Sequence, residues 1–191
     1  LKSSAKVKDR EFRNLVNWMY LKTTRNGASF SEYKKFIEQN EDYPRINRIR
    51  YLAEEKIYLR NNSPTSIINW FEKYPPLGGL GKIKLAEAYL EQGKTTKVKE
   101  LIKDGWITAT IRKNDLGYYR AKFKKFIDTD DHIKRADYLA WERKYWDLKR
   151  MLKYLPKDQR ALYNARQILM SNSYGVDNAI AKVPQYLKED P

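Results

Sequence analysis

Apolar residues recur every three or four positions along almost the whole of this chain, and that spacing limits the folds open to it. The first such stripe, which includes Phe12 and Leu15, covers about residues 7 to 25 and ends before Gly27. No Val-, Ile- or Thr-rich stretch alternates with the period of two that a half-buried strand shows. The sequence therefore predicts an all-α protein of about ten short helices joined by short loops.

Residues that commonly cap helices stand where several of these stripes begin. Ser29 or Ser31 can cap one helix, and Ser63 followed by Pro64 is a typical start of another. The acidic pair at residues 130–131 is expected to cap a third. Further helices are expected to open at Asp42 and Asn114 and to cover residues 82–92, 97–107, 157–170 and 176–183.

Three stretches, residues 85–102, 137–152 and 164–183, share one outline of small and apolar residues, a short turn and further apolar residues. Each is a helix hairpin whose apolar face needs a neighbour, as in tetratricopeptide arrays. We therefore expect a single domain over residues 1–191, a superhelix (solenoid) of antiparallel helix hairpins. Solenoids present long concave surfaces, which favours binding over catalysis.

The composition excludes several kinds of site. With no cysteine, the chain can hold neither a disulfide nor a thiolate zinc site, and it has no Cys nucleophile. A single histidine, His132, excludes a His-rich metal centre, and we expect no metal and no cofactor. No run approaches the roughly 20 apolar residues of a membrane-spanning helix, so no membrane span is expected.

The formal net charge of +15 favours anionic partners such as nucleic acid, anionic lipid or a cell-wall polymer with free carboxylates. The basic residues are spread along the chain rather than gathered in a tail. A binding surface and a plain compositional bias therefore explain the charge equally well.

No residue pattern indicates catalysis. His132 near a helix start is more often a packing or capping residue than a base, and adjacent acidic residues on a helix do not face one another. The stretch GGLGK (78–82) loosely resembles a phosphate loop, but Pro76 stands where a glycine is required and Ile83 replaces the magnesium-binding Ser or Thr. We interpret it as a helix connector.

Several charged residues lie beside apolar helix faces. We favour their pairing in buried networks between stacked helices, because a buried charge needs a partner; Asp137 with Arg135 or Arg150 is the expected pair. The alternative is a concave site for a polyanion. The residues concerned are Arg50, Arg135, Asp137, Arg150 and Arg166.

Tryptophans at helix spacing usually belong to the core, although an exposed one can stack on a sugar or a base. Trp70, Trp106 and Trp141 are expected to fill the seams between helices. Trp146 is the one expected to be exposed, because its neighbours already fill the inner face of its helix.

A series of motifs follows one another in a fixed order along the chain. The most specific is DHIKRADYLAW (131–141), whose marker positions are Asp131, His132, Arg135, Asp137, Leu139 and Trp141. The others are RIRYLAEEKI (48–57), SIINWFEKYPPLGGLGKIKLAEAYLEQG (66–93), KVKELIKDGW (97–106), KRML (149–152), NAR (164–166) and VPQYL (183–187).

In this order, the motifs resemble the superhelical, U-shaped N-terminal domain of bacterial soluble lytic murein transglycosylases, from about residue 30 to the end. The sequence departs from the family at Ala140, where a second Leu is usual, and at Tyr145 and Leu148, where small residues are common. The resemblance implies a periplasmic protein whose superhelix surrounds a lysozyme-like domain that cleaves the glycan to 1,6-anhydro-muramyl products. That family's catalytic Glu precedes a Ser, and no Ser follows a Glu here. We therefore expect no catalytic residue in this chain and a catalytic domain C-terminal to residue 191.

The resemblance further implies that peptidoglycan glycan strands are the partner and that this part of the protein is a non-catalytic scaffold and binding domain. Two rivals remain, a basic helical-repeat module for nucleic acid, which we favour less, and a tetratricopeptide-like scaffold for protein partners. Candidate ligand-binding residues are Arg135, Trp146, Arg150 and Arg166, and candidate structural residues are Asp131, His132, Asp137, Trp141, Trp70 and Trp106.

Overall fold

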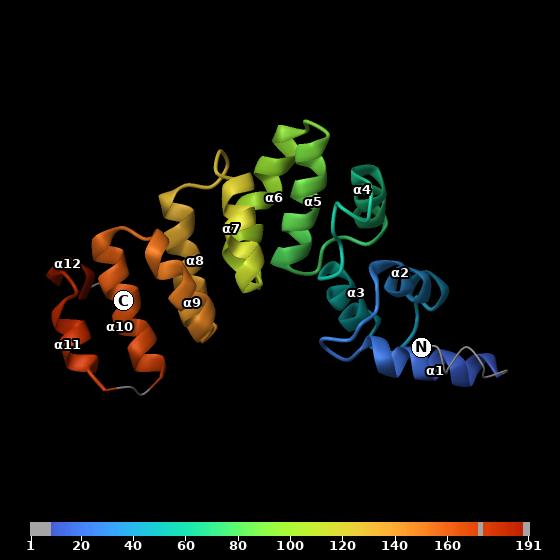
Figure 1. Ribbon diagram of the computed structural model, residues 1–191, viewed down its shortest axis with the longest axis horizontal. Helices are drawn as coiled ribbons and strands as arrows, with labels where there is room; N and C mark the ends of the chain where they lie inside the picture. The colour runs from blue at the N-terminus through green and yellow to red at the C-terminus, as the bar shows by residue number, and fades with distance from the viewer. Residues whose placement is uncertain (1–8, 172–173, 189–191) are drawn as a thin grey trace. The chain divides into compact units, whose positions relative to one another are not determined.

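The computed structural model describes residues 9–171 and 174–188, and over these residues the protein is built from helices packed on helices, with no strand (Figure 1). The all-α prediction is confirmed. The α-helices are α1 (Arg10–Leu21), α2 (Phe30–Gln39), α3 (Ile46–Glu54), α4 (Pro64–Lys73), α5 (Gly79–Glu91), α6 (Thr95–Thr108), α7 (Lys113–Lys122), α8 (Thr129–Trp141), α9 (Tyr145–Met151), α10 (Lys157–Met170), α11 (Val176–Ala181) and α12 (Gln185–Lys188), with a 3-10 turn η2 (Leu152–Tyr154) after α9.

Most helix starts lie where the capping residues predicted them. Ser29 and Glu32 form a reciprocal capping box at α2, and the Ser63 hydroxyl accepts the backbone N–H of Ser66 at α4. At α8 the cap is Asp128, two residues before the predicted pair, and Asp131 completes its capping box. The predicted first helix also included residues 7 and 8, which lie outside the described residues.

The chain divides into two compact units, Leu1–Gly93 and Lys94–Pro191. In the N-terminal unit α2 packs on α3, and α5 packs on both α3 and α4. Trp70 of α4 is 4 % exposed and meets the Phe30 ring edge-on, with 5.3 Å between ring centroids. Its predicted place in the core is confirmed.

In the glycine-rich stretch 78–82, which resembles a phosphate loop, backbone N–H groups bind a carboxylate of the chain itself. The buried carboxylate of Glu54, the last residue of α3, accepts the backbone N–H groups of Leu77 at 2.6 Å, Gly78 at 3.2 Å and Gly81. Gly78 and Gly81 belong to the first turn of α5, where backbone N–H groups have no partner within the helix; α5 begins at Gly79, earlier than the predicted residue 82. Glu54 thus joins α3 to the start of α5.

Burial raises the pKa of Glu54 to about 7, against the opposing effects of its backbone donors and of Arg50. Because its pKa when unfolded is about 4.5, folding favours the protonated carboxyl. The contribution of Glu54 to the unfolding free energy of the N-terminal unit should therefore be largest below pH 4.5 and fall by about 3 kcal/mol as pH rises to 7. Urea unfolding across this pH range measures the slope. Glu54→Gln should remove the part of this pH dependence that arises from Glu54. If the unfolding free energies of both proteins changed equally with pH, the raised pKa of Glu54 would be contradicted.

In the C-terminal unit α8 is the central helix, in contact with α6, α9 and α10, while α11 packs on α10 (Figure 1). Trp106 of α6 is fully buried, as predicted, and its indole N–H donates to Nδ1 of His132 over 3.1 Å. His132 is therefore a packing residue, as expected. Burial, helped by the nearby charge of Arg120, lowers its pKa.

Arg135 also belongs to this buried cluster. Its guanidinium donates to the carbonyl oxygen of Trp106 and, over 3.4 Å, to that of Ile107, and it lies over the Trp106 ring. Burial lowers its pKa to about 10. The side chain is 1 % exposed, so the structure corrects its assignment as a ligand-binding residue: Arg135 holds α8 against the end of α6.

Candidate functional site

Three of the residues singled out in the sequence, Asp137, Trp141 and Arg166, meet at one surface pocket of about 480 Å³ in the C-terminal unit. The pocket lies among α8, α10 and the segment that contains α11 and α12. Its lining consists of Asp137, Trp141, Leu162, Tyr163, Ala165, Arg166, Leu169, Ile180, Val183, Leu187 and Lys188. We call it the Trp141 pocket.

Helix periodicity places two of these side chains together. Asp137 and Trp141 are four residues apart on α8 and therefore share one face of that helix. The buried residues of α8, which include Arg135 and Leu139, occupy other positions of the same helix. α10, which packs on α8, supplies Arg166 from the opposite side.

A short ion pair fixes the polar side of the Trp141 pocket. Nη1 of Arg166 donates to Oδ1 of Asp137 over 2.6 Å, and the Tyr163 hydroxyl donates to the same oxygen over 3.4 Å. The Arg166 guanidinium also lies 5.4 Å from the centroids of both the Trp141 and the Tyr163 rings. Two side chains of opposite charge are thereby held beside an aromatic surface, and both remain partly open to solvent.

This pair corrects the expected partner of Asp137. We expected Arg135 or Arg150, which lie nearer in sequence. Arg135 instead donates to backbone carbonyls, and Arg150 pairs with Asp147 on its own helix. The role expected of Asp137, a link between neighbouring helices, is performed with Arg166 of α10.

Trp141 was expected to fill a seam, and the structure corrects this as well. Its side chain is 72 % exposed. Leu139 and Ala140 are buried at the last turn of α8, so the next residue, the last of the helix, points outward. Trp141 therefore lies at the surface, beside the fixed ion pair, and lines the pocket rather than filling the core.

The floor of the Trp141 pocket is the small apolar core of the last three helices. Ala165 of α10 packs there with Ala179, Val183 and Leu187, and Leu162 lies against them. Leu169 and Ile180 line the pocket and are 50 % and 38 % exposed. The pocket therefore combines an apolar floor, a flat aromatic wall and one fixed pair of charges.

The remaining candidates lie elsewhere. Trp146 of α9 is 65 % exposed, which confirms the prediction, and it meets the Tyr145 ring edge-on. It does not line the Trp141 pocket, and neither does Arg150. Of the four candidate ligand-binding residues, the structure brings only Arg166 into this pocket.

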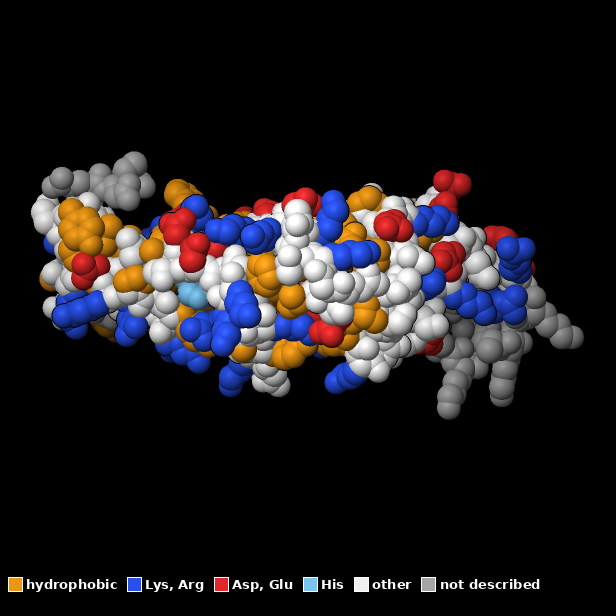
Figure 2. All heavy atoms as spheres, turned by 90° about the horizontal axis from the view of Figure 1, so that it is seen from above, with side chains coloured by type: hydrophobic (Ala, Val, Ile, Leu, Met, Phe, Trp, Pro, Cys, Tyr) orange, Lys and Arg blue, Asp and Glu red, His pale blue; other side chains and the backbone are white. Residues whose placement is uncertain are grey.

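Basic side chains are distributed widely over the surface. Figure 2 shows Lys and Arg spread along the visible face, with Asp and Glu between them. A local concentration surrounds a second pocket of the C-terminal unit, of about 410 Å³, lined by Lys99, Lys103, Lys124 and Lys125. Lys103 is already paired, with Asp128 at 3.2 Å and Asp131 at 3.3 Å.

Within residues 9–171 and 174–188, no group of three or more His, Asp or Glu side chains is arranged to hold a metal ion. Among these residues there is also no helix with the length and apolar character needed to cross a membrane. In comparisons with known proteins, no family model, no curated protein and no solved structure matches this chain.

Proposed function

We propose that this chain is a non-catalytic, peptidoglycan-binding domain of a periplasmic lytic murein transglycosylase, and that the Trp141 pocket holds part of the glycan strand. The ordered motifs from residue 48 to residue 187 support the family assignment. The observation that carries the binding role is the exposed Trp141 beside the Arg166–Asp137 pair, above an apolar floor.

Each part of the Trp141 pocket suits a component of peptidoglycan. The exposed face of Trp141 offers a platform for a sugar ring, whose C–H bonds pack well against an aromatic face. Arg166 presents planar N–H donors that match a carboxylate, and muramic acid and its stem peptide carry carboxylates. Asp137 can accept hydrogen bonds from sugar hydroxyls or amides. The apolar floor suits the methyl groups of N-acetyl substituents.

The same proposal gives the rest of the chain a scaffold role. Its helix hairpins would continue as a superhelix next to a lysozyme-like catalytic domain C-terminal to residue 191. Binding of the glycan here would keep the strand near that domain, which would perform the cleavage. The chain by itself should then bind peptidoglycan without releasing anhydro-muramyl products.

Trp141→Ala should weaken co-sedimentation with purified peptidoglycan sacculi by about tenfold, because we expect a sugar stacked on this ring to contribute as much as a base stacked on an aromatic side chain, on the order of 1–3 kcal/mol. The unfolding free energy should change by less than about 1 kcal/mol, since the ring is 72 % exposed. Trp146→Ala is the matched control, because that ring is 65 % exposed and lies outside the pocket. An equal loss in both variants, or none in either, would refute the assigned site.

The lysine-lined pocket supports a second candidate, binding to nucleic acid. Lys99, Lys124 and Lys125 surround one hollow and could contact successive phosphates. Excess RNA in the sacculus experiment separates the two functions. Binding to sacculi that persists in RNA and depends on Trp141 supports the peptidoglycan proposal. Binding that RNA abolishes supports nucleic acid if it falls steeply with salt in the unchanged protein and if Lys124→Gln weakens it and lowers its salt dependence while Trp141→Ala does neither.

A further inference from the structure

A further pocket of the C-terminal unit, of about 370 Å³, opens where the loop after α7 meets the start of α8. It lies beside the first turn of α8, whereas Trp141 is the last residue of that helix. We call it the His132 pocket. Its lining includes Arg120, Lys124, Ile127, Asp128, His132 and Tyr154.

The imidazole of His132 supplies this pocket with one fixed N–H donor. Its Nδ1 accepts the indole N–H of Trp106 over 3.1 Å, so the proton of the neutral ring is on Nε2. His132 is 8 % exposed and lines the pocket, and in the part of the chain that the structure describes its Nε2 has no hydrogen-bond partner. The Trp106 contact therefore holds the ring with an unused donor at the pocket.

Two cations of the His132 pocket have no counter-charge. Among the described residues, neither Arg120 nor Lys124 forms an ion pair with a carboxylate. The carboxylate in the lining, that of Asp128, accepts the backbone N–H of Asp131 over 3.0 Å and pairs with Lys103 over 3.2 Å. Asp131 accepts the backbone N–H of Asp128 and pairs with the same lysine. Both carboxylates are thus satisfied by Lys103 and by the first turn of α8, which leaves Arg120 and Lys124 uncompensated.

We propose that the His132 pocket binds the phosphate group of a soluble phosphate monoester. Arg120 offers paired N–H donors that match phosphate oxygens, Lys124 adds a point charge, and Nε2 of His132 adds a neutral donor. A phosphate monoester carries a charge of about −1.5 to −2 near pH 7, which matches two uncompensated cations. A carboxylate, or a phosphate diester of a nucleic-acid backbone, carries a single negative charge and would leave one cation unmatched.

The remaining surface of the pocket suits the group that carries the phosphate. The pocket is larger than a phosphate group, and the side chains of Ile127 and Tyr154 provide apolar contacts. The Arg120 guanidinium lies 4.4 Å from the centroid of the Tyr154 ring, which holds it beside the pocket. This inference is independent of the peptidoglycan proposal, because none of these residues lines the Trp141 pocket.

The test uses the single histidine of the chain as its probe. Methyl phosphate is titrated into the full chain at about pH 7.5, where it is mostly divalent, and the ring C–H signals of His132 are followed by ¹H–¹³C NMR. These signals should shift and saturate with one dissociation constant. Arg120→Gln/Lys124→Gln changes two exposed side chains and should fold as the unchanged protein does, but it should bind at least about tenfold more weakly.

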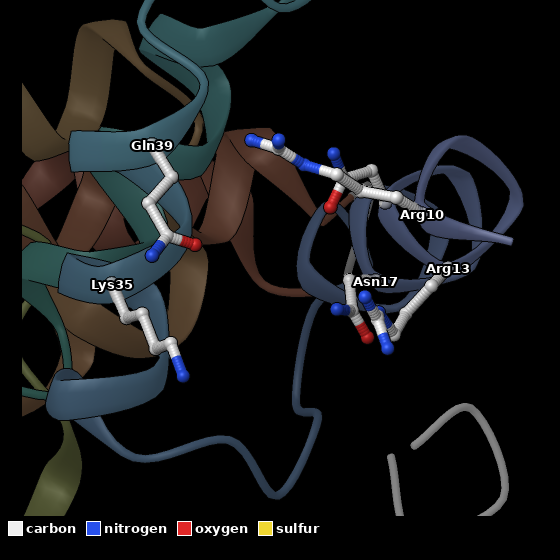
Figure 3. A pocket seen from close by; sticks show the side chains of 6 residues that line it. Arg10, Arg13, Asn17, Lys35 and Gln39 are labelled. Carbon is white, nitrogen blue, oxygen red and sulfur yellow. The ribbon is translucent and has the colours of Figure 1, made fainter. Parts of the chain in front are cut away.

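Two control variants remove the same charge elsewhere. Lys99→Gln/Lys125→Gln changes the adjoining lysine-lined pocket, and Arg10→Gln/Lys35→Gln changes the pocket between α1 and α2 of the other unit (Figure 3). Both should bind methyl phosphate nearly as the unchanged protein does. If either control lost as much affinity as Arg120→Gln/Lys124→Gln, or if His132 did not respond to methyl phosphate, the assigned site would be refuted.

Two further titrations decide the class of ligand. Dimethyl phosphate and acetate, each with a single charge, should bind at least about tenfold more weakly than methyl phosphate. Equal affinity for either would overturn the assignment to a monoester. A short single-stranded RNA without terminal phosphates should not displace methyl phosphate at the same total phosphate concentration. Displacement would show that the pocket takes the phosphates of nucleic acid and would overturn the soluble source.

Discussion

Replacing Trp106 with alanine should lower the free energy of unfolding of the C-terminal unit by about 3–5 kcal/mol, the usual range for a fully buried tryptophan. The ring fills the seam between α6 and α8, and its N–H is the donor to Nδ1 of His132. The cationic Arg135 also lies over the Trp106 ring, with Cζ of its guanidinium 5.1 Å from the ring centroid. The substitution therefore leaves a cavity, an unpaired imidazole nitrogen and a buried charge without its aromatic neighbour.

Urea unfolding measures this loss, and two variants divide it into its causes. Trp106→Phe keeps most of the apolar volume but removes the donor to His132, so it should cost about 1–3 kcal/mol. Trp141→Ala removes a ring of the same size that is 72 % exposed and should cost less than about 1 kcal/mol. If Trp106→Ala costs no more than Trp141→Ala, the cluster around His132 does not hold the unit together.

The helices could be predicted well because their signals are local. A capping box such as Ser29 with Glu32 lies within four residues, and a Pro64 that follows a Ser63 fixes a helix start without help from the rest of the chain. Buried tryptophans in the middle of apolar stripes, Trp70 and Trp106, also followed from spacing alone. Each of these features depends only on residues within one turn or on one face of a single helix.

The Trp141 pocket could be predicted only in part, because it depends on which helices are neighbours. Spacing places Asp137 and Trp141 on one face of α8, but it does not reveal that α10 brings Arg166 to that face. Spacing also fails at the end of a helix: the buried stripe of α8 ends at Ala140, and the following Trp141 is 72 % exposed. The motif at residues 131–141 contains both Arg135 and Trp141, and only the packing separates the buried Arg135 from the exposed Trp141.

The pocket between α1 and α2, lined by Arg10, Arg13, Asn14, Asn17, Lys35 and Gln39, could not be predicted from the sequence. Arg10, Arg13 and Asn17 have the appearance of a solvated helix face, which is the usual location of such residues. Only the exposure of Phe12 and Met19 on the other side of α1 shows that the helix presents these polar side chains to α2. The orientation of a helix about its own axis is decided by packing, and periodicity cannot supply it.

The contact of Glu54 with the start of α5 could not be predicted from the sequence either. Because of this contact, Gly81→Ala should destabilise the N-terminal unit by about 3 kcal/mol. A Cβ at this position would lie 2.5 Å from the Glu54 carboxyl carbon and from one of its oxygens. Glu54 is 3 % exposed and anchored by Leu77 and Gly78, so it has little room to move. The methyl group would displace the carboxylate from its donors, which lie at the start of α5.

Gly117→Ala is the matched control, because this glycine is also helical, in α7, but a Cβ there would meet no atom within 4 Å. Alanine at an open helix position should raise stability by about 0.5–1 kcal/mol, through its better helix propensity. Urea unfolding should thus show that Gly81→Ala lowers the unfolding free energy and that Gly117→Ala raises it. The double variant Gly81→Ala/Glu54→Ala, in which the clash is absent, should be less destabilised than the sum of its single changes. Strict additivity would show that Gly81 and Glu54 do not share a contact, and Glu54 would then not be what requires a glycine at the start of α5.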